Sequence, residues 1–359
     1  MSQLTINTTQ LQSLVNRANQ CVGANKLHRI TNMIGIKTVD NKLTLYTTDG
    51  TNYLCVTAGV ADADDIDVAV NAETFIKLIN KITSDTVALD VSDNALVISG
   101  NGSYKIALEL DDDGEILSFP VKIPDNHVKF GEISLPAVST ILSALKSSLS
   151  TNAGSVYANY FVGDCVCATD KSMMGLYQYE MLTNEDSKLL LNSTFVELLN
   201  LATDNISLEY DEETSTLIAT SENYCLYAKV VTDCADYNIS GIKKMLAVEQ
   251  ESYCKVRKRD LLELLDRLSL FVGAYDDGAI SLEFTSDSLK VSSMSSTGVE
   301  VVNYTEFKDA KAKSIKININ RFMAQLKSYT SDAVEIYYGS DLCIKLTDGD
   351  VSQVIALMR

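Results

Sequence analysis

One amphipathic helix pattern occurs three times in this chain, at intervals of about a third of its length. Residues 72–83, 193–203 and 320–330 each place a phenylalanine four residues before an isoleucine or leucine and eight before a threonine. Residues three or four apart share one side of a helix, so the pattern predicts a buried stripe. The phenylalanines are 120 and 127 residues apart, at Phe75, Phe195 and Phe322. This spacing indicates an internal repeat, which constrains the fold more than any single helix.

The segments around this helix recur in the same order. In each copy a short strand precedes a first helix whose apolar residues fall five, eight and nine positions after Ile6, Ile133 or Val256. Alternating segments typical of strands follow, and two more come after the second helix. Each copy therefore predicts two helices and about eight strands in about 120 residues, an α+β fold with helices packed on antiparallel sheets. We expect three repeated domains, at 1–125, 126–245 and 246–359, with the second boundary in the polar segment 240–251.

Charge is distributed unevenly between the predicted helices and the rest of the chain. The formal net charge of −18 alone argues against nucleic-acid binding, because phosphate contacts need lysine and arginine. However, the predicted helices contain ten basic and five acidic residues, a balance of +5, which leaves −18 − 5 = −23 for the remainder. These helices are 8–22, 72–82, 135–149, 193–203, 257–271 and 319–329. The helices are thus mildly basic, although ordinary solvated surfaces can produce the same imbalance.

The sequence offers no convincing catalytic or metal-binding constellation. Only two histidines occur, both isolated, and no glycine-rich phosphate-binding loop follows a strand. Asp49 and Asp170 recur at equivalent places, where a turn is a better interpretation than catalysis. Eight scattered cysteines favour buried, reduced thiols over disulfides or metal. No signal peptide or membrane span is visible. We expect a soluble, cytoplasmic protein that is not an enzyme and needs no cofactor or metal.

The repeats carry a likeness to a known family. The segment LTLYTTDGTNYL (43–54), the SFP that closes the first copy and the C-terminal VIALMR (354–359) resemble the bacterial β sliding clamps, the processivity subunit (β subunit) of DNA polymerase III. The likeness covers the whole chain, but the tail lacks the family's proline and final leucine. It implies a DNA clamp fold: a head-to-tail homodimer in which six similar domains form a ring around double-stranded DNA, with the helices lining the hole. The implied role, in DNA replication, is to tether the replicative polymerase for processive synthesis.

The resemblance also implies two sets of site residues. Sequence-independent DNA contacts would come from the basic residues of the helices and the loop after the first helix, namely Arg17, Lys26, Arg29, Lys77, Lys81, Lys146, Arg257, Lys258, Arg259, Arg267, Arg321 and Lys327. Polymerase, clamp loader and other partners would insert short apolar peptides between the second and third domains. That pocket would include Phe161, Thr169, Met174, Ala235, Ile239, Asn318, Arg321, Leu342, Val354, Ala356, Leu357 and Met358. Lys171, Ser172, Ala235 and Ala356 depart from the family's usual residues there.

Three alternatives stay open from the sequence. A two-domain clamp that closes as a trimer is related, but three copies in one chain favour a dimer. A repetitive β-rich structural or adhesion protein would also have repeats and an acidic surface, without DNA binding. An enzyme with an unrecognised site would depend on Asp49 and Asp170 as its best candidates.

Overall fold

The computed structural model describes residues 2–23, 28–61, 63–92, 94–121, 123–183, 187–273, 276–309 and 311–359. They form two compact units. The first combines Met1–Leu135 with Thr194–Val230, and the second combines Pro136–Ser193 with Val231–Arg359. Each unit thus holds one whole repeat and part of the middle one, so the three-domain division stays a prediction. Across the described ranges no helix is both long and apolar enough to span a membrane.

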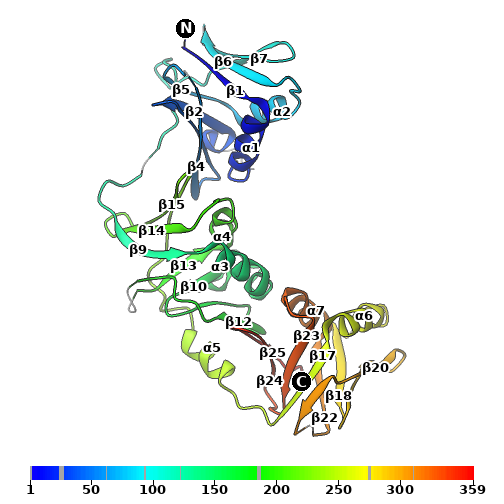
Figure 1. Cartoon of the computed structure of the whole chain (residues 1–359). Helices are drawn as coiled ribbons and strands as arrows, with labels where there is room; N and C mark the ends of the chain where they lie inside the picture. Colours follow the sequence, from blue (N-terminus) through cyan, green and yellow to red (C-terminus); the bar gives the residue numbers. More distant parts are fainter. Residues whose placement is uncertain are drawn as a thin grey trace. The chain divides into compact units, whose positions relative to one another are not determined.

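The first unit contains two antiparallel sheets (Figure 1). The smaller has the order β1 (Ser2–Asn7), β6 (Thr86–Ser92), β7 (Ala95–Ser99) and β8 (Ser103–Ala107). The larger has the order β5 (Ile66–Asn71), β2 (Met33–Val39), β3 (Lys42–Thr48), β4 (Asn52–Gly59), β16 (Tyr224–Lys229), β15 (Thr216–Ser221), β14 (Ile206–Asp211) and β9 (Val128–Ile133).

The second unit follows the same plan. Its larger sheet has the order β13 (Leu189–Asn192), β10 (Asn159–Val162), β11 (Val166–Thr169), β12 (Met173–Tyr177), β25 (Val351–Ala356), β24 (Cys343–Asp348), β23 (Ala333–Tyr338), β17 (Ser252–Arg257) and β21 (Glu306–Lys308). Its smaller sheet has the order β20 (Val299–Asn303), β19 (Ser288–Ser293), β18 (Ala279–Phe284) and β22 (Lys313–Asn318).

Strand order reveals how successive repeats are joined. Every repeat supplies two four-stranded arrays, and those of the first repeat are β1-β6-β7-β8 and β5-β2-β3-β4. At the end of the second array, β4 pairs with β16 of the middle repeat, and in the same way β12 of the middle repeat pairs with β25 of the third. We call these the first and second joints. Each large sheet is therefore built from two repeats across one joint.

All six predicted helices are present, which confirms the helical periodicity. They are α1 (Thr8–Asn19), α2 (Ala72–Ile79), α3 (Leu135–Thr140) with its π and 3-10 continuations (Ile141–Leu145 and Lys146–Ser148), α4 (Ser193–Leu199), α6 (Lys258–Ser269) and α7 (Ile319–Ser328). Short 3-10 turns also form at Arg29–Asn32 and Val156–Ala158. Asn7, Asn71 and Asn318 begin α1, α2 and α7 because each side-chain oxygen accepts a backbone N–H of the first turn.

The second helix of each repeat ends earlier than the sequence pattern suggested. We expected Thr83 to continue the buried stripe of Phe75 and Ile79, but α2 ends at Ile79 and Thr83 is exposed. Its N–H and hydroxyl instead bond the Oδ1 of Asn101, at 2.6 and 3.2 Å. Its counterpart Thr330 bonds a carboxylate oxygen of Asp348 in the same two ways. In the first and third repeats the threonine therefore fixes the turn after the helix rather than its packing.

One helix was not predicted. The segment 240–251 was expected to be a polar boundary, but Ile239–Leu246 forms α5. Its Ile242 and Leu246, four residues apart, are buried on the large sheet of the second unit. The polar residues between them hid an ordinary apolar stripe.

The large sheet of the second unit is covered on both faces. Adjacent residues of β25 point to opposite faces: Ile355 belongs to the core under α6 and α7, whereas Val354 belongs to a second cluster under α5. Cys343 and Ile344 of β24 divide in the same way. We call the side under α5 the outer face. Together with the core of the third repeat, these clusters confirm the α+β class.

Candidate nucleic-acid and partner-binding surfaces

Five of the predicted DNA-binding residues have acidic neighbours. The pairs are Arg29 with Glu109, Lys77 with Glu73, Arg259 with Asp260 and Glu263, Arg267 with Glu300, and Arg321 with Asp170. Their N–O distances range from 2.5 Å for Lys77 to 3.8 Å for the contact of Arg259 with Glu263. Exposed ion pairs each stabilise a fold by about 0–1 kcal/mol, so a phosphate could replace such a carboxylate. Sequence reasoning missed Glu109, Glu300 and Asp170 because they are far from their partners in the sequence.

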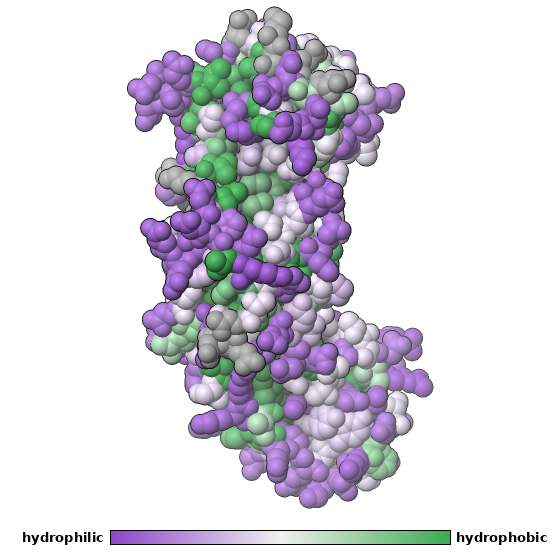
Figure 2. Space-filling model, turned by 60° about the vertical axis from the view of Figure 1, so that its left-hand side comes forward, coloured by the Kyte–Doolittle hydropathy of each residue, from purple (hydrophilic) through white to green (hydrophobic). Residues whose placement is uncertain are grey.

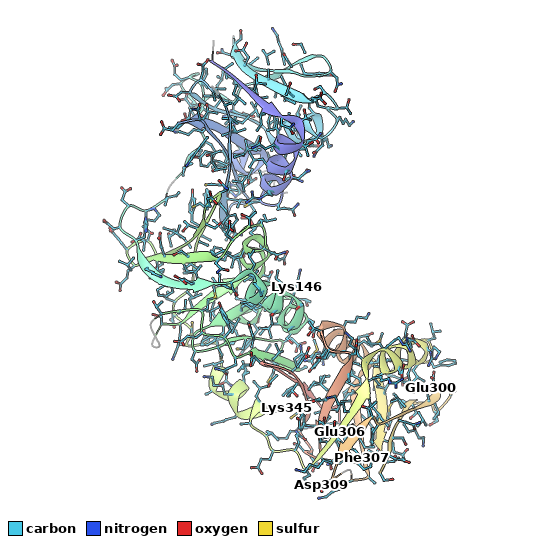
Figure 3. The ribbon with its side chains drawn as sticks, viewed as in Figure 1. Lys146, Glu300, Glu306, Phe307, Asp309 and Lys345 are labelled. Carbon is cyan, nitrogen blue, oxygen red and sulfur yellow. The ribbon has the colours of Figure 1, made fainter. Side chains whose placement is uncertain are left out.

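The remaining predicted DNA-binding residues differ in how exposed their side chains are and in whether these already donate a hydrogen bond within the protein. Arg17 is half-buried, and burial lowers the pKa of its guanidinium; its Nη2 donates to the carbonyl of Asn223 at 3.4 Å. Lys258 Nζ donates to the carbonyl of Tyr329 at 2.7 Å. Lys26 lies outside the described residues. Exposed positions are held by Lys81, Lys146, Arg257 and Lys327. Figure 3 labels Lys146 at the end of the segment that follows α3.

Part of the predicted partner pocket assembles on the outer face of the second unit. Phe161 and Val354 are buried in one apolar cluster, and Met174 and Ile239 pack against it half-exposed. At its centre the ring of Tyr237 lies 5.5 Å from that of Phe161. Four predicted residues from strands far apart in sequence therefore share one apolar surface. Sequence reasoning missed Tyr237, which directly precedes the N-cap residue of α5.

Two hollows adjoin this cluster and share Phe161, Lys188 and Ile239 in their walls. One of them also contains the predicted Ala235, together with Cys234 and Tyr237. The other extends past Asp164, whose carboxylate pairs with Lys243 of α5. An apolar floor with charged rims is typical of a site for a short peptide with apolar anchors. The space-filling view shows separate apolar areas among hydrophilic side chains (Figure 2).

Several of the other predicted pocket residues belong to the C-terminal tail, residues 356–358, and to the segments that it contacts. The backbone N–H groups of Ala356, Leu357 and Met358 bond the carbonyls of Ser172, Leu342 and Lys316 at 2.8–2.9 Å. Leu357 packs against the core of the third repeat rather than against the outer cluster. Leu342 is 57% exposed. These backbone hydrogen bonds hold the tail, and its half-buried side chains at 356–358 and the exposed Arg359 are available to a partner.

The turn that follows Thr169 connects β11 with β12 and reaches Arg321 of α7. Thr169 is buried, and its hydroxyl donates to the carbonyl of Met173. Asp170 accepts the N–H groups of Ser172 and Met173 at 2.7 and 2.6 Å, and its other oxygen lies 3.6 Å from Arg321. Lys171, where the family usually has glycine, adopts a left-handed φ of +77°. Asn318 caps α7 by accepting the N–H of Arg321.

The aspartate turns explain why Asp49 and Asp170 recur. Asp49 Oδ1 accepts the N–H groups of Thr51 and Asn52 at 2.8 and 2.7 Å, as Asp170 does in the second copy. These bonds fix a tight turn between neighbouring strands, which supports the turn interpretation over catalysis. Among the residues that the structure describes, no group of three or more His, Cys, Asp or Glu side chains is placed to hold a metal.

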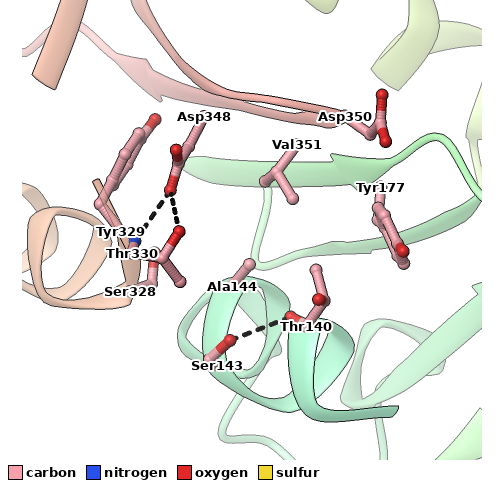
Figure 4. A pocket seen from close by; sticks show the side chains of 10 residues that line it. All are labelled: Thr140, Ser143, Ala144, Tyr177, Ser328, Tyr329, Thr330, Asp348, Asp350 and Val351. Atoms are coloured by element: carbon pink, nitrogen blue, oxygen red, sulfur yellow. Dashed lines mark hydrogen bonds between the residues drawn. The ribbon is translucent and has the colours of Figure 1, made fainter. Parts of the chain in front are cut away.

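A polar cavity lies at the second joint, on the helix side of the sheet (Figure 4). It is bordered by Ala144, by Tyr177 of β12 and by the loop and strand that contain Asp348 and Val351. Hydrogen bonds from Thr330 and Ser331 hold the carboxylate of Asp348. Its pKa is lowered because these bonds outweigh the opposing effect of burial. The carboxylate therefore fixes the helix–strand connection and is not poised for proton transfer.

Comparison with known proteins gives matches among solved structures only. No family model matches the chain, and no curated protein matches it. It resembles the β subunit of the Streptococcus pyogenes DNA polymerase at 17% identity and a TM-score of 0.86, over 99% of this chain and 100% of that one. It resembles the Bacillus subtilis DNA polymerase sliding clamp at 15% identity and a TM-score of 0.83, over 100% and 99%.

A third match has a bound ligand. The Pseudomonas aeruginosa sliding clamp, DNA polymerase III subunit beta bound to griselimycin, is 14% identical with a TM-score of 0.86, over 100% of this chain and 99% of that one. At these identities the likeness establishes the fold. The chain therefore has, over its whole length, the fold of the bacterial DNA polymerase sliding clamps.

Proposed function

We propose that this protein is a DNA sliding clamp without catalysis of its own. Two copies associate head to tail into a ring around double-stranded DNA, and the ring tethers the replicative polymerase and other partners. The observation that carries the proposal is the repeated joint. Within one chain the joint forms twice, as β4 with β16 and as β12 with β25. Each time the last strand of the second array of one repeat pairs with the last strand of the first array of the next repeat. We infer that a third joint of this kind forms between two chains.

The strands for that third joint are β8 and β20. They end the first array of the first repeat and the second array of the third repeat, and each lies at a sheet edge. A head-to-tail contact of this kind is heterologous and must close into a ring or continue as a filament. Pairing the two edges would also remove exposed strand edges that invite aggregation.

The internal registers predict how β8 and β20 meet. Directly opposed residues at the two existing joints include Cys55 with Cys225 and Leu176 with Ser352. Matching the strand registers of the three repeats puts Val299 at the place of Cys55 and Ser103 at that of Cys225. We therefore expect Val299 of one chain opposite Ser103 of the other.

Side chains at these edges fit an interface. Val299 and Val301 are 47% and 57% exposed, and Tyr104 of β8 is 41% exposed. Leu270 and Phe271, at the end of α6, are also exposed. At the second joint the helical segment after α3 contacts α7, and α6 is the equivalent first helix of the third repeat. Leu270 and Phe271 would therefore meet α2 of the second chain, and burying such apolar groups stabilises association.

The helices supply the proposed DNA contacts. Loose, sequence-independent binding needs phosphate attraction without contacts to base edges. Lys81, Lys146, Arg257 and Lys327 are exposed on or beside the helices, while most of the formal negative charge belongs to strands and loops. The adjoining ion pairs keep this attraction weak, which suits a protein that slides.

The outer cluster supplies the proposed partner site. Phe161, Met174, Ile239 and Val354 offer an apolar surface for the anchors of a short peptide, and Arg321 lies beyond the Asp170 turn. Methionine adapts its shape to different apolar partners. Lys171 lies with its Nζ 5.1 Å from the centre of the Tyr157 ring, so this rim differs from one formed by glycine.

Topology provides the test of the proposal. The protein should remain on nicked circular DNA after loading and should be lost when the circle is cut once. Met358→Ala should weaken binding of the host polymerase tail peptide more than retention on circles. A protein that is monomeric at micromolar concentration and binds circular and linear DNA alike would contradict the ring. Equal loss of both activities in Met358→Ala would make the tail structural.

A further inference from the structure

Two cysteines from different repeats face each other at the first joint. Cys55 of β4 and Cys225 of β16 are directly opposed in the antiparallel register, and both are free thiols. Thr57 N–H bonds the carbonyl of Asn223, two residues along each strand, so Cys55 and Cys225 are a hydrogen-bonded pair with Cα atoms about 5.5 Å apart. This spacing lies within the range of about 4.4–6.8 Å found in disulfides. Neither strand therefore needs a large shift for the sulfurs to bond.

The surroundings hold the two thiols together. Cys55 is 6% exposed and Cys225 is half-buried, so one sulfur is protected and the other is within reach of solutes. Tyr53 and Tyr227, the next opposed pair on the same face, stack with ring centres 5.0 Å apart. Together with Ile218 they form one cluster that fixes the two strands side by side. Because side chains alternate along each strand, this cluster lies on the sheet face opposite to that of Leu54 and Leu226.

The fold itself does not require cysteine at these positions. At the second joint the equivalent residues are Leu176 and Ser352, and the two strands pair there in the same register. The cysteine pair is therefore a property of the first joint of this chain. No other described cysteine pair is directly opposed on neighbouring strands. Cys165 and Cys167, which are close in sequence, flank Val166 at the start of β11.

We propose that Cys55 and Cys225 are an oxidation site, at which a small disulfide such as oxidised glutathione converts the two thiols into one bond across the first joint. The Cys225 thiolate attacks one sulfur of glutathione disulfide, and one glutathione thiolate leaves. The Cys55 thiolate then attacks the Cys225 sulfur of the mixed disulfide and expels the second glutathione. Two protein thiols are oxidised, one glutathione disulfide is reduced to two thiols, and the two protons pass to the leaving thiolates.

The second step sets the pH dependence. A hydrogen bond with the Cys225 thiol and burial raise the pKa of the Cys55 thiol well above its usual range. The thiolate is the attacking species, so the raised pKa slows bond formation near neutral pH and favours it as pH rises. Other titratable groups near the pair are Tyr46, Tyr53, Tyr224, Tyr227 and Cys21. None of them carries a positive charge that would favour the thiolate.

The bond would tie the first repeat to the middle one covalently. It would close a loop that contains all of the chain between residues 55 and 225, from β5 to β15. A crosslink over a long loop stabilises mainly by restricting the unfolded chain. This inference does not depend on ring formation or DNA binding, since both cysteines belong to one unit of one chain.

Thiol counting tests the proposal on the full-length protein. The protein is incubated with oxidised glutathione at about pH 8.5, near the usual thiol pKa, then denatured and alkylated. Intact mass should show that accessible thiols fall from eight to six, since one bond consumes two. Peptide mapping should find one link, Cys55 to Cys225, within a single chain. Its formation should be slower at neutral pH, and a reductant should reverse it.

Matched variants separate this pair from the other cysteines. Cys165→Ser should still lose two thiols, whereas Cys225→Ser and Cys225→Ala should retain all seven that remain. Cys225 is half-buried, so these changes should leave the fold intact by circular dichroism. The proposal is overturned if wild-type protein keeps eight thiols, stops at a glutathione adduct on Cys225, links another pair or links two chains.

Discussion

The two joints of the chain have the same backbone hydrogen-bond register but different side chains. At the first, Thr57 N–H donates to the carbonyl of Asn223, and at the second Gln178 N–H donates to that of Asp350, at 3.2 and 3.0 Å. The helix residue beside them is Arg17 at the first joint and, from the repeat offset, Ala144 at the second. Arg17 reaches Asn223, whereas Ala144 leaves the polar cavity of Figure 4 next to Asp350.

The strand interiors differ as well. Leu54 pairs with Leu226 at the first joint, whereas Gly175 pairs with Gln353 at the second. Gln353 is fully buried, and its Nε2 donates to the carbonyl of Ala144 at 2.6 Å and to Ser328 at 2.9 Å. Antiparallel pairing thus defines the joint, and apolar or polar side chains can fill it. A third joint between chains can therefore form with side chains unlike those of either internal joint.

The largest expected effect concerns that third joint. In an antiparallel pair, the backbone groups of every second residue face the same neighbouring strand. The even-numbered Gly298 and Tyr304 bond Ser293 of β19 and the adjoining Asp287, so the odd-numbered Val301 directs its backbone groups away from β19. Val301→Pro removes an N–H on the free edge, where proline is tolerated in the folded monomer. The dimer dissociation constant should rise roughly tenfold to a hundredfold by sedimentation, from a lost hydrogen bond and a poorly fitting ring. Val301→Thr, which keeps the N–H, should leave it nearly unchanged.

The next effect tests the packing of the second joint. A Cβ on Gly175 would lie 2.7 Å from Leu145 Cδ2 and 3.5 Å from Ser148 Oγ. Gly175→Ala should therefore lower the free energy of unfolding by about 1–3 kcal/mol, as overpacking does. Gly59→Ala at the end of β4 is the matched control, because its Cβ would meet no atom within 4 Å. Equal denaturation midpoints for both variants would show that the second joint is loosely packed.

A smaller loss is expected at the first joint. Arg17→Ala removes the packing of a half-buried stem and a long hydrogen bond to Asn223. The free energy of unfolding should fall by about 1 kcal/mol. Arg259→Ala should have almost no effect, because that side chain is 79% exposed. Chemical denaturation measures both, and a neutral Arg17→Ala would make the arginine irrelevant to the joint.

The smallest effect is a transplant between the joints. Ala144→Arg places the side chain of the first joint into the cavity of the second, within reach of the Asp350 carbonyl by analogy with Arg17. We expect a gain of about 0.5–1 kcal/mol in the free energy of unfolding, from one net hydrogen bond. Ser139→Arg, at an exposed position of α3 that does not line the cavity, should be neutral. A loss in Ala144→Arg alone would mean that the cavity is not an unfilled arginine site.

The sequence predicted what depends on local periodicity. The six helices and the order of strands in each repeat follow from spacings such as Phe75 to Ile79, which a helix must bury on one side. The joints could not be predicted in this way, because β4 and β16 are separated by more than a hundred residues and their register depends on both repeats. The helix α5 was missed because its apolar stripe is short.

The site was predicted less completely than the fold. Phe161, Met174, Ile239 and Val354 meet in one cluster, and its use as a partner site stays a prediction. Ion pairs such as Arg29 with Glu109 were invisible, since the partners are 80 residues apart. A count of charges on helices therefore overestimates how many cations are unpaired. The opposition of Cys55 and Cys225 depends on the register of the joint and could not be predicted either.

Crosslinking at the third joint tests the central claim most directly. With Ser103→Cys and Val299→Cys in the same chain, mild oxidation should give a reductant-sensitive species of twice 39.3 kDa on a denaturing gel. Neither single variant should give it efficiently. A double variant that stays at 39.3 kDa, under conditions where both new thiols react with a maleimide, would contradict the pairing of β8 with β20 and the ring that depends on it.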